Sequence, residues 1–254
     1  MKILITNDDG IFAEGLLKLA CSLEKLGEIY IVAPDRQRSA MGHAITMHEP
    51  LRASKIQMLD KSFHAWSVSG TPADCVKLGI EALLPHKPDI VLSGINSGAN
   101  LGTDVLYSGT VSAAIEGAML GFPSVALSLA GFSDFNYDYA GEFSCIVAKK
   151  MIEKKLPPDT LLNVNIPNCS RKEIGGVKIT TLGVRKYKNS FIERIDPRGQ
   201  SYYWLGGEIA EDNNLEGTDI HCVKNNNISI TPIHFDLTRF GLLKELDSWN
   251  IEID

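Results

Sequence analysis

The sequence predicts an α/β fold, in which a doubly wound and mostly parallel sheet is followed by an appendage of hairpins and a helix. Three observations predict it. Short apolar runs alternate with helical patterns up to about Pro167, as in sheets whose strands are buried on both faces. Polar or glycine-rich loops follow several of these runs, which is typical of open sheets that bind ligands at the carboxyl ends of their strands. Beyond Pro167, short strand candidates and polar turns replace the alternation.

Composition indicates an ordinary water-soluble protein of one large domain or of one domain with an appendage. The 254 residues are 44% hydrophobic and carry a formal net charge of -6, which argues against binding of a nucleic-acid polymer. The five cysteines are scattered and form no C-x-x-C motif, which favours reduced thiols in the cytoplasm. We expect no signal peptide, because Asp8 and Asp9 interrupt the N-terminal apolar run. We also expect no membrane partner, because no stretch approaches the ~20 apolar residues of a membrane span.

The N-terminal segment predicts a strand, a helix and a second strand. An apolar run, Ile3 to Ile5, leads into Asn7-Asp8-Asp9-Gly10. Leucines then recur at helical spacing until Gly27, and residues 28–34 form the next apolar run. The polar loop 35–42 follows at the carboxyl end of that second strand, so we expect it close to Asp8 and Asp9.

The middle of the chain continues the alternation. Residues 45–56 are interpreted as extended and 65–69 as a strand, and Thr71-Pro72 with Asp74 is a strong helix start. A buried strand at 89–92 opens into a long loop, 93–110, and a helix then runs to Met119.

The remaining elements are predicted in two groups. The alternating part ends with a strand at 122–129, a helix at 137–155 and a strand at 161–166. The later part has strand candidates at 177–182, 201–205 and 228–233, and an amphipathic helix at 239–249 whose apolar stripe is Leu242, Leu243, Leu246 and Trp249. A short terminal helix is rarely stable alone, so we expect this stripe to pack on its own domain or, preferably, on a second subunit.

A candidate metal site lies at the predicted edge of the sheet. Asp8, Asp9, Ser39 and Asn96 all follow strands and offer only oxygen ligands, a set that suits Mg²⁺ or Mn²⁺ with water and substrate in the open positions. The alternative is an Asp-Gly turn with solvated acids. His43 and His48 lie near in sequence but are excluded, because a lone histidine is more often structural.

The long loop ends at a candidate anion site. Ser108, Gly109 and Thr110 lie at the start of a helix, where free backbone N–H groups and the helix dipole favour a phosphate. The alternative is that Ser108 or Thr110 only caps the helix. The loop matches neither a Walker A nor a G-x-G-x-x-G motif, so the standard NTPase and dinucleotide-binding classes lack their signatures.

Several motifs, in order along nearly the whole chain, resemble the SurE family, the survival-protein-E type nucleotidases. They are Ile5 to Gly10, Ala33-Pro34-Asp35 with Arg38-Ser39, Gly70 to Val76, Ser93 to Gly117, Gly217-Thr218-Asp219 and Ser229 to Pro232. Ser112 is a small departure, because members often carry glycine there. The resemblance implies a Rossmann-like catalytic core over 1–167 that binds metal and phosphate, and an extension over 168–254 that builds homodimers or homotetramers.

The resemblance also implies the reaction. Family members hydrolyse nucleoside 5′- and 3′-monophosphates, and some also cleave short polyphosphate. Asp8, Asp9, Ser39 and Asn96 fall on the metal-ligand positions for one divalent ion per subunit. Asn96, Ser108, Gly109 and Thr110 are expected to bind the phosphate. Asp8 or Asp9 is expected to orient or deprotonate the attacking water; a covalent aspartyl-phosphate is the competing route, but the D-x-D spacing of such phosphatases is missing.

Two other classes of protein remain as alternatives from the sequence. One is a non-enzymatic nucleotide-binding regulator that uses the metal only to hold its ligand. The other is a glycosyltransferase-like enzyme, because such chains also open with a strand, a glycine-containing turn and a helix. Release of inorganic phosphate distinguishes the first, and dependence on a nucleotide-sugar donor would support the second.

Overall fold

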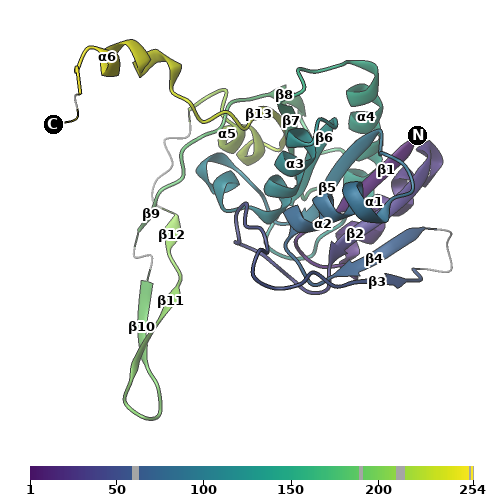
Figure 1. Cartoon of the computed structure of the whole chain (residues 1–254), viewed down its shortest axis with the longest axis horizontal. Coiled ribbons are helices and arrows are strands. Elements are labelled where there is room, and N and C mark those ends of the chain that lie inside the picture. Colours follow the sequence, from purple (N-terminus) through teal and green to yellow (C-terminus); the bar gives the residue numbers. More distant parts are fainter. Residues whose placement is uncertain (59–62, 189–190, 210–214, 252, 254) are drawn as a thin grey trace.

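The computed structural model describes residues 1–58, 63–188, 191–209, 215–251 and 253. A central sheet with helices on both faces forms the body of the molecule, and two segments extend away from it (Figure 1). The predicted α/β class and doubly wound, mostly parallel sheet are confirmed.

Within the described residues the central sheet has nine strands, in the order β3-β4-β2-β1-β5-β6-β7-β13-β8. From β4 to β7 the strands run parallel. The chain adds strands on one side of β1 and then on the other, so the order reverses between β1 and β5, where open α/β sheets bind ligands. The parallel strands are β1 (Lys2–Thr6), β2 (Glu28–Pro34), β4 (His64–Val68), β5 (Ile90–Ser97), β6 (Ser124–Ala130) and β7 (Thr160–Pro167).

An antiparallel pair follows the parallel strands on each side of the sheet. On one side β3 (Ala53–Ile56) is antiparallel to β4. On the other, β13 (Asn227–His234) is antiparallel to β7 and parallel to β8 (Gly176–Ile179). The strands predicted at 177–182 and 228–233 therefore extend the same sheet, although they follow residue 167.

Helices cover the two faces in pairs. On one face α1 (Glu14–Leu23) and α4 (Asp138–Glu153) share a hydrophobic cluster with Ile3 and Ile5. On the other face α2 (Pro72–Leu78) packs in a cluster that contains Leu4. There α3 (Gly109–Met119) lies beside α2. Alternate residues of β1 thus pack on opposite faces, which explains why this strand is apolar without interruption.

Two predicted features of the middle of the chain have different outcomes. Thr71 caps α2 as predicted: its hydroxyl accepts from Asp74 N while the Asp74 carboxylate accepts from Thr71 N. Of the range 45–56, which was interpreted as extended, only 53–56 form a strand, β3. Residues 45–52 form no strand. Those residues include Thr46, whose N–H and hydroxyl instead bond the Asp74 carboxylate.

The sequence did not predict several short elements that follow residue 167. Helix α5 (Asp219–Lys224) packs against β13 and β7. Strand β10 (Phe191–Ile195) pairs antiparallel with β11 (Ser201–Leu205), the strand that was predicted at 201–205. Six residues are too few to show a helical period clearly.

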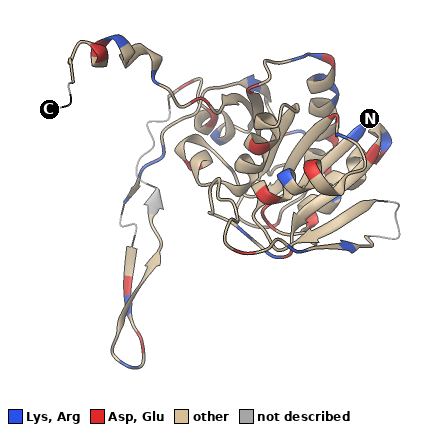
Figure 2. Cartoon of the chain, in the orientation of Figure 1, with Lys and Arg blue, Asp and Glu red and all other residues tan. Residues whose placement is uncertain are grey.

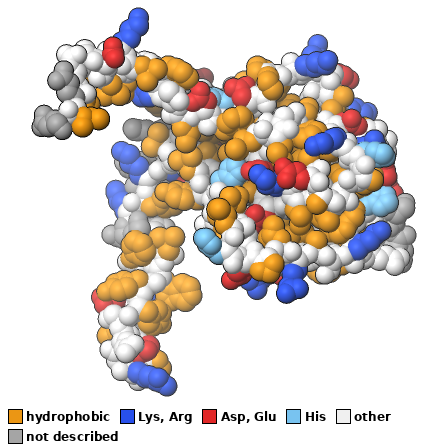
Figure 3. Space-filling view, in the orientation of Figure 1, with side chains coloured by type: hydrophobic (Ala, Val, Ile, Leu, Met, Phe, Trp, Pro, Cys, Tyr) orange, Lys and Arg blue, Asp and Glu red, His pale blue; other side chains and the backbone are white. Residues whose placement is uncertain are grey.

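The segments that leave the body are called here the arm and the tail. The arm is the described part of 187–209: β10, β11, and the pair formed by β9 (Tyr187–Lys188) and β12 (Glu208–Ile209). The tail is the described part of 235–253, in which the helix predicted at 239–249 is shortened to a 3-10 turn, Phe240–Leu242, and α6 (Leu243–Asp247). Both project from the body (Figure 1), and apolar side chains cover much of their surface (Figure 3).

No helix in the described part of the chain is long and apolar enough to cross a bilayer. Figure 2 shows lysine and arginine residues interspersed with acidic ones over the body.

Candidate active site at the carboxyl edge of the sheet

A tight turn at the end of β1 presents the two adjacent carboxylates. The Asn7 side chain donates to Gly10 O at 2.9 Å and accepts from Gly10 N at 3.2 Å. Gly10 has φ +102°, a value that favours glycine. The turn therefore holds Asp8 and Asp9 at the carboxyl edge of the sheet, next to the end of β5.

Asp8 is buried, and its environment makes ionisation costly. Its side chain accepts a short hydrogen bond from the Thr110 hydroxyl of α3. Burial raises the pKa of the Asp8 carboxyl to about 6; the Thr110 bond opposes this rise, and the neighbouring charge of Asp9 adds to it. A positive ion beside Asp8 would relieve both the burial and the repulsion.

The first turn of α3 packs directly on Asp8. A Cβ on Gly109 would lie 2.7 Å from Asp8 Cβ, so a larger residue there would push the helix away. Ser108 is the N-cap, and its Oγ accepts from Val111 N at 3.1 Å. The negative carboxylate and the positive end of the helix dipole are therefore adjacent.

Asp9 is less buried and forms a second network. Its Oδ2 accepts from Ser97 N at 3.1 Å and from Ser97 Oγ at 3.3 Å. Ser97 Oγ in turn lies 2.8 Å from the Tyr137 hydroxyl. These bonds fix one oxygen of Asp9 and leave Oδ1 available for a ligand.

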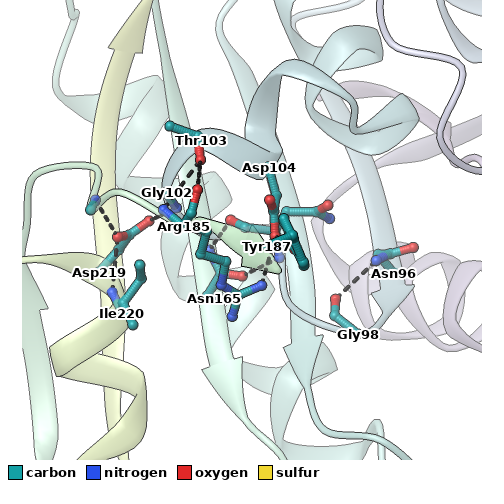
Figure 4. Close-up of polar contacts among 12 residues, drawn as sticks. Asn96, Gly98, Gly102, Thr103, Asp104, Asn165, Arg185, Tyr187, Asp219 and Ile220 are labelled. Carbon is teal, nitrogen blue, oxygen red and sulfur yellow. Dashed lines mark hydrogen bonds and ion pairs between the residues drawn. The ribbon is translucent and has the colours of Figure 1, made fainter. Parts of the chain in front are cut away.

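Ser39 and Asn96 reach the same place from two other strands. Arg38 N donates to Asp8 O at 2.7 Å, which docks the loop after β2 against the end of β1. Ser39, in that loop, is exposed, and its Oγ accepts from Gln37 at 3.0 Å. Asn96 donates its amide N–H to Gly98 O at 2.9 Å (Figure 4), so its Oδ1 is the atom available for ligation.

One depression of about 400 Å³ gathers the predicted metal ligands and Ser108. Its lining includes Asp8, Asp9, Ser39, Asn96 and Ser108. None of its lining residues in the described chain is a lysine or arginine. Gly109 and Thr110 are not part of the lining, and the Thr110 hydroxyl, predicted to bind phosphate, bonds Asp8 instead.

The donor set fits a hard divalent cation. Two carboxylates, a hydroxyl and an amide carbonyl face a depression that lacks a basic side chain, and Asp8 resists ionisation without a counter-charge. Among the described residues no group of three or more His, Cys, Asp or Glu side chains could hold a metal. A cation at this edge would thus need Ser39 and Asn96 besides the acids.

The excluded His43 has a partner of its own. Its Nε2 lies 2.8 Å from Glu116 Oε2 of α3. This contact agrees with the structural interpretation of that histidine.

Sequence reasoning missed how the site loop is held from the C-terminal part of the chain (Figure 4). The buried Asp219 carboxylate accepts from Gly102 N at 2.7 Å and from Gly183 N at 2.8 Å. Asp104, which lines the depression, is bound by Arg185 at 2.8 Å and by the Tyr187 hydroxyl at 2.6 Å. Asp219 stands in the Gly217-Thr218-Asp219 motif, which was the only available signal.

Asparagine side chains of the neighbouring strand β7 also hold the same loop. Asn163 and Asn165 of β7 both donate to Asn100 O at 2.9 Å, and Asn100 donates to Ser128 at 2.8 Å. These buried amides hold the loop at several points, although the Asn163 Oδ1 atom itself has no hydrogen-bond partner among the described residues.

Comparisons with known proteins agree with this architecture. A family model described as survival protein SurE matches residues 3–189. The 5′-nucleotidase SurE of Alkaliphilus metalliredigens is 54% identical over 253 residues, which cover 99% of this chain and 100% of that protein. The 5′-nucleotidase SurE of Heliobacterium modesticaldum is 51% identical, over 98% of this chain and 92% of that one. The crystal structure of the SurE protein from Aquifex aeolicus matches with a TM-score of 0.85 at 43% identity, over 99% of this chain and 100% of that one.

Proposed function

Because the chain belongs to the SurE family, we propose that it is a metal-dependent 5′-nucleotidase, which hydrolyses nucleoside monophosphates to nucleosides and inorganic phosphate. One observation of the structure supports this most directly. The acid pair at the end of β1 touches the N-terminus of α3, with Gly109 packed on Asp8. A phosphomonoester satisfies both features, because one oxygen can face a cation while others face the helix.

The ligand set supports one divalent ion per subunit, Mg²⁺ or Mn²⁺, on Asp8, Asp9, Ser39 and Asn96. Such an ion screens the charge of the phosphate and polarises its P–O bonds. Ser108, which lines the depression, then holds phosphate oxygens where negative charge accumulates, and the N–H groups of Gly109 and Thr110 behind it add the field of the helix N-terminus. Asn96, which lines the same depression, also contacts the phosphate.

Asp9 is the better placed of the two acids to act on water. Its carboxylate is only half-buried and keeps Oδ1 available, whereas Asp8 is buried and bonded to Thr110. Asp9 orients a water and takes one of its protons as the water oxygen forms the new P–O bond. The P–O bond to the nucleoside breaks, and the ester oxygen takes up a proton from solvent water to leave as the nucleoside hydroxyl. No covalent aspartyl-phosphate is needed in this route.

The proposal extends to substrates beyond 5′-monophosphates. A 3′-monophosphate and short polyphosphate offer the same terminal phosphoryl group to the depression of about 400 Å³. A single metal and one helix N-terminus suffice for each of them.

We further propose that the protein is a cytoplasmic homodimer or homotetramer. All five cysteines are unpaired, which suits a reducing compartment. The arm and the tail expose large apolar side chains, among them Trp204, Leu205, Leu243 and Trp249. A second copy of the chain is the partner that would cover them.

The test is phosphate release from a panel of nucleoside 5′- and 3′-monophosphates, with short polyphosphate and a nucleotide sugar as further substrates. Release of inorganic phosphate from the monophosphates is the expected result. Binding of nucleotides without any release would return the protein to the class of regulators. Turnover of the nucleotide sugar alone would favour the glycosyltransferase class.

A further inference from the structure

A second depression, of about 550 Å³, lies beside the acid site on the side of β6 and α5. Ser97, Gly98 and Ala99 line both depressions, so this short segment is the ridge between them. A ligand held at Asp8 and Asp9 could therefore reach across the ridge along the carboxyl edge of the sheet.

Contacts within the chain also link the second depression to the acids. Phe135, in its wall, stacks on Tyr137 with ring centroids 6.0 Å apart. The Tyr137 hydroxyl bonds Ser97, and Ser97 bonds Asp9. Three consecutive contacts thus join the aromatic wall to a proposed metal ligand.

The lining suits a flat and largely apolar group. Leu101, Ile220 and Val223 supply aliphatic surface, and Phe132 adds a ring that is 100% exposed in the described chain. An exposed aromatic ring beside a polar site is a platform on which a heteroaromatic base can stack. The volume is within the range of small-molecule sites.

A second phosphate fits this depression less well. Arg185 and Lys224 both lie in its wall, but the Arg185 guanidinium is already paired with Asp104 at 2.8 Å, and Lys224 also has an interaction within the chain. The positive charge of Arg185 is therefore largely neutralised by a carboxylate of the same chain.

We propose that this depression is the subsite for the base of a nucleoside monophosphate, with Phe132 as its stacking residue. The inference rests on the proposed function, since it assumes that the phosphate lies at Asp8 and Asp9. Stacking in this subsite uses a remote part of the substrate to hold the phosphate in place for reaction. It would make the enzyme prefer nucleotides over simple sugar phosphates.

The test compares adenosine 5′-monophosphate with ribose 5-phosphate, which lacks the base. The wild-type protein with its metal should have a higher kcat/KM for the nucleotide, by about tenfold, on the scale of one base–aromatic stack. Phe132→Ala should remove most of that preference, chiefly through KM, and leave ribose 5-phosphate within about twofold of the wild type. Phe132→Trp, which keeps a stacking ring, should retain the preference.

Phe12→Ala is the matched control, because Phe12 is 72% exposed and lines neither depression. It should leave both substrates unchanged. Equal kcat/KM for the two substrates in the wild type would overturn the base subsite and leave the nucleotidase standing. So would an equal loss on both substrates in Phe132→Ala. Release of phosphate from neither substrate would instead overturn the proposed function.

Discussion

The carboxyl edge of the sheet and the two projecting segments differ in how well one chain alone buries and bonds their side chains. At the edge, Asp8, Ser108 and Thr110 are buried, and each has a hydrogen-bond partner in the same chain. In the arm every residue of β10 and β11 is exposed, and in the tail α6 buries none of its residues. These polar groups at the edge thus find partners within one chain, whereas the arm and the tail leave large apolar side chains exposed.

This difference teaches that the tail is separate from the proposed site, whereas the arm is joined to it, because Tyr187 of β9 bonds Asp104 in the lining of the depression. The polar groups of the site are fixed by local turns and by α3. The arm and the tail expose large apolar side chains, which a second chain would cover in the proposed assembly. Changes at the edge should therefore affect chemistry, and changes in the tail should affect assembly.

The largest expected effect is on catalysis through Asp9. Asp9→Asn should lower phosphate release by about a thousandfold or more, because a charged ligand that stabilises several kcal/mol of transition-state charge is lost. Phosphate release and calorimetric metal titration measure it, and circular dichroism checks the fold. Asp89→Asn is the control, since Asp89 lies at the opposite end of β5 and bonds Lys2 N. Metal affinity and turnover like the wild type in Asp9→Asn would remove Asp9 from the site.

The next effect concerns the stability of the metal-free protein through Asp8. Its folded pKa of about 6 lies above the ordinary 3.8, so the protonated form favours folding, and this contribution is lost as the pH rises through 6. Asp8→Asn has no carboxylate to ionise, so it avoids that loss. The change in unfolding free energy that the substitution causes should therefore be about 2–3 kcal/mol more stabilising at pH 8 than at pH 4 in the metal-free protein. Urea denaturation with chelator at both pH values measures it. An equal effect at both would show that Asp8 ionisation costs nothing. The same variant should be catalytically inactive.

A smaller effect is expected at the helix N-terminus. Ser108→Ala removes a cap and a phosphate ligand, so it should cost about 1 kcal/mol of stability and about 1–3 kcal/mol of transition-state stabilisation. Metal binding should be little changed. Thr71→Ala is the matched control, because Thr71 caps α2 away from the depression. It should lose similar stability and keep its activity; similar activity losses in both would reduce Ser108 to a cap.

The smallest numerical change is in particle mass. A chain that ends at Thr238 lacks Leu242, Leu243, Leu246 and Trp249, and light scattering should show at least about a twofold lower mass than for the full chain. Phosphate release per subunit should stay within a few fold, because the polar groups at the edge find their partners within one chain. Lys244→Ala, on the same helix, controls for loss of a polar residue. An unchanged mass, or a wild type that is already monomeric, would contradict this part of the account.

Much of the fold could be predicted because its signals are local. The apolar run of β1, the leucine spacing of α1 and the Thr71-Pro72 cap of α2 all lie within one element. The predicted metal ligands meet in space because parallel strands end at one edge, which is a property of the topology. The predicted helix at 239–249 is shorter in the structure, because little of the chain packs against the tail to lengthen it.

The contacts that fix the site could not be predicted, because they join distant residues. Thr110 and Asp8 are separated by 102 positions, and Gly102 and Asp219 by 117. Nothing near Thr110 shows that its hydroxyl serves Asp8 and not a ligand. The division at residue 167 stays a prediction, although β8 and β13 carry the central sheet beyond it.

The most direct test of the central claim is phosphate release from adenosine 5′-monophosphate as a function of metal. The claim is that a cation at Asp8 and Asp9 and the N-terminus of α3 hold one phosphate between them. Protein treated with chelator should release no phosphate, and added Mg²⁺ or Mn²⁺ should restore turnover in the wild type but not in Asp9→Asn. Equal turnover with and without chelator would contradict the account.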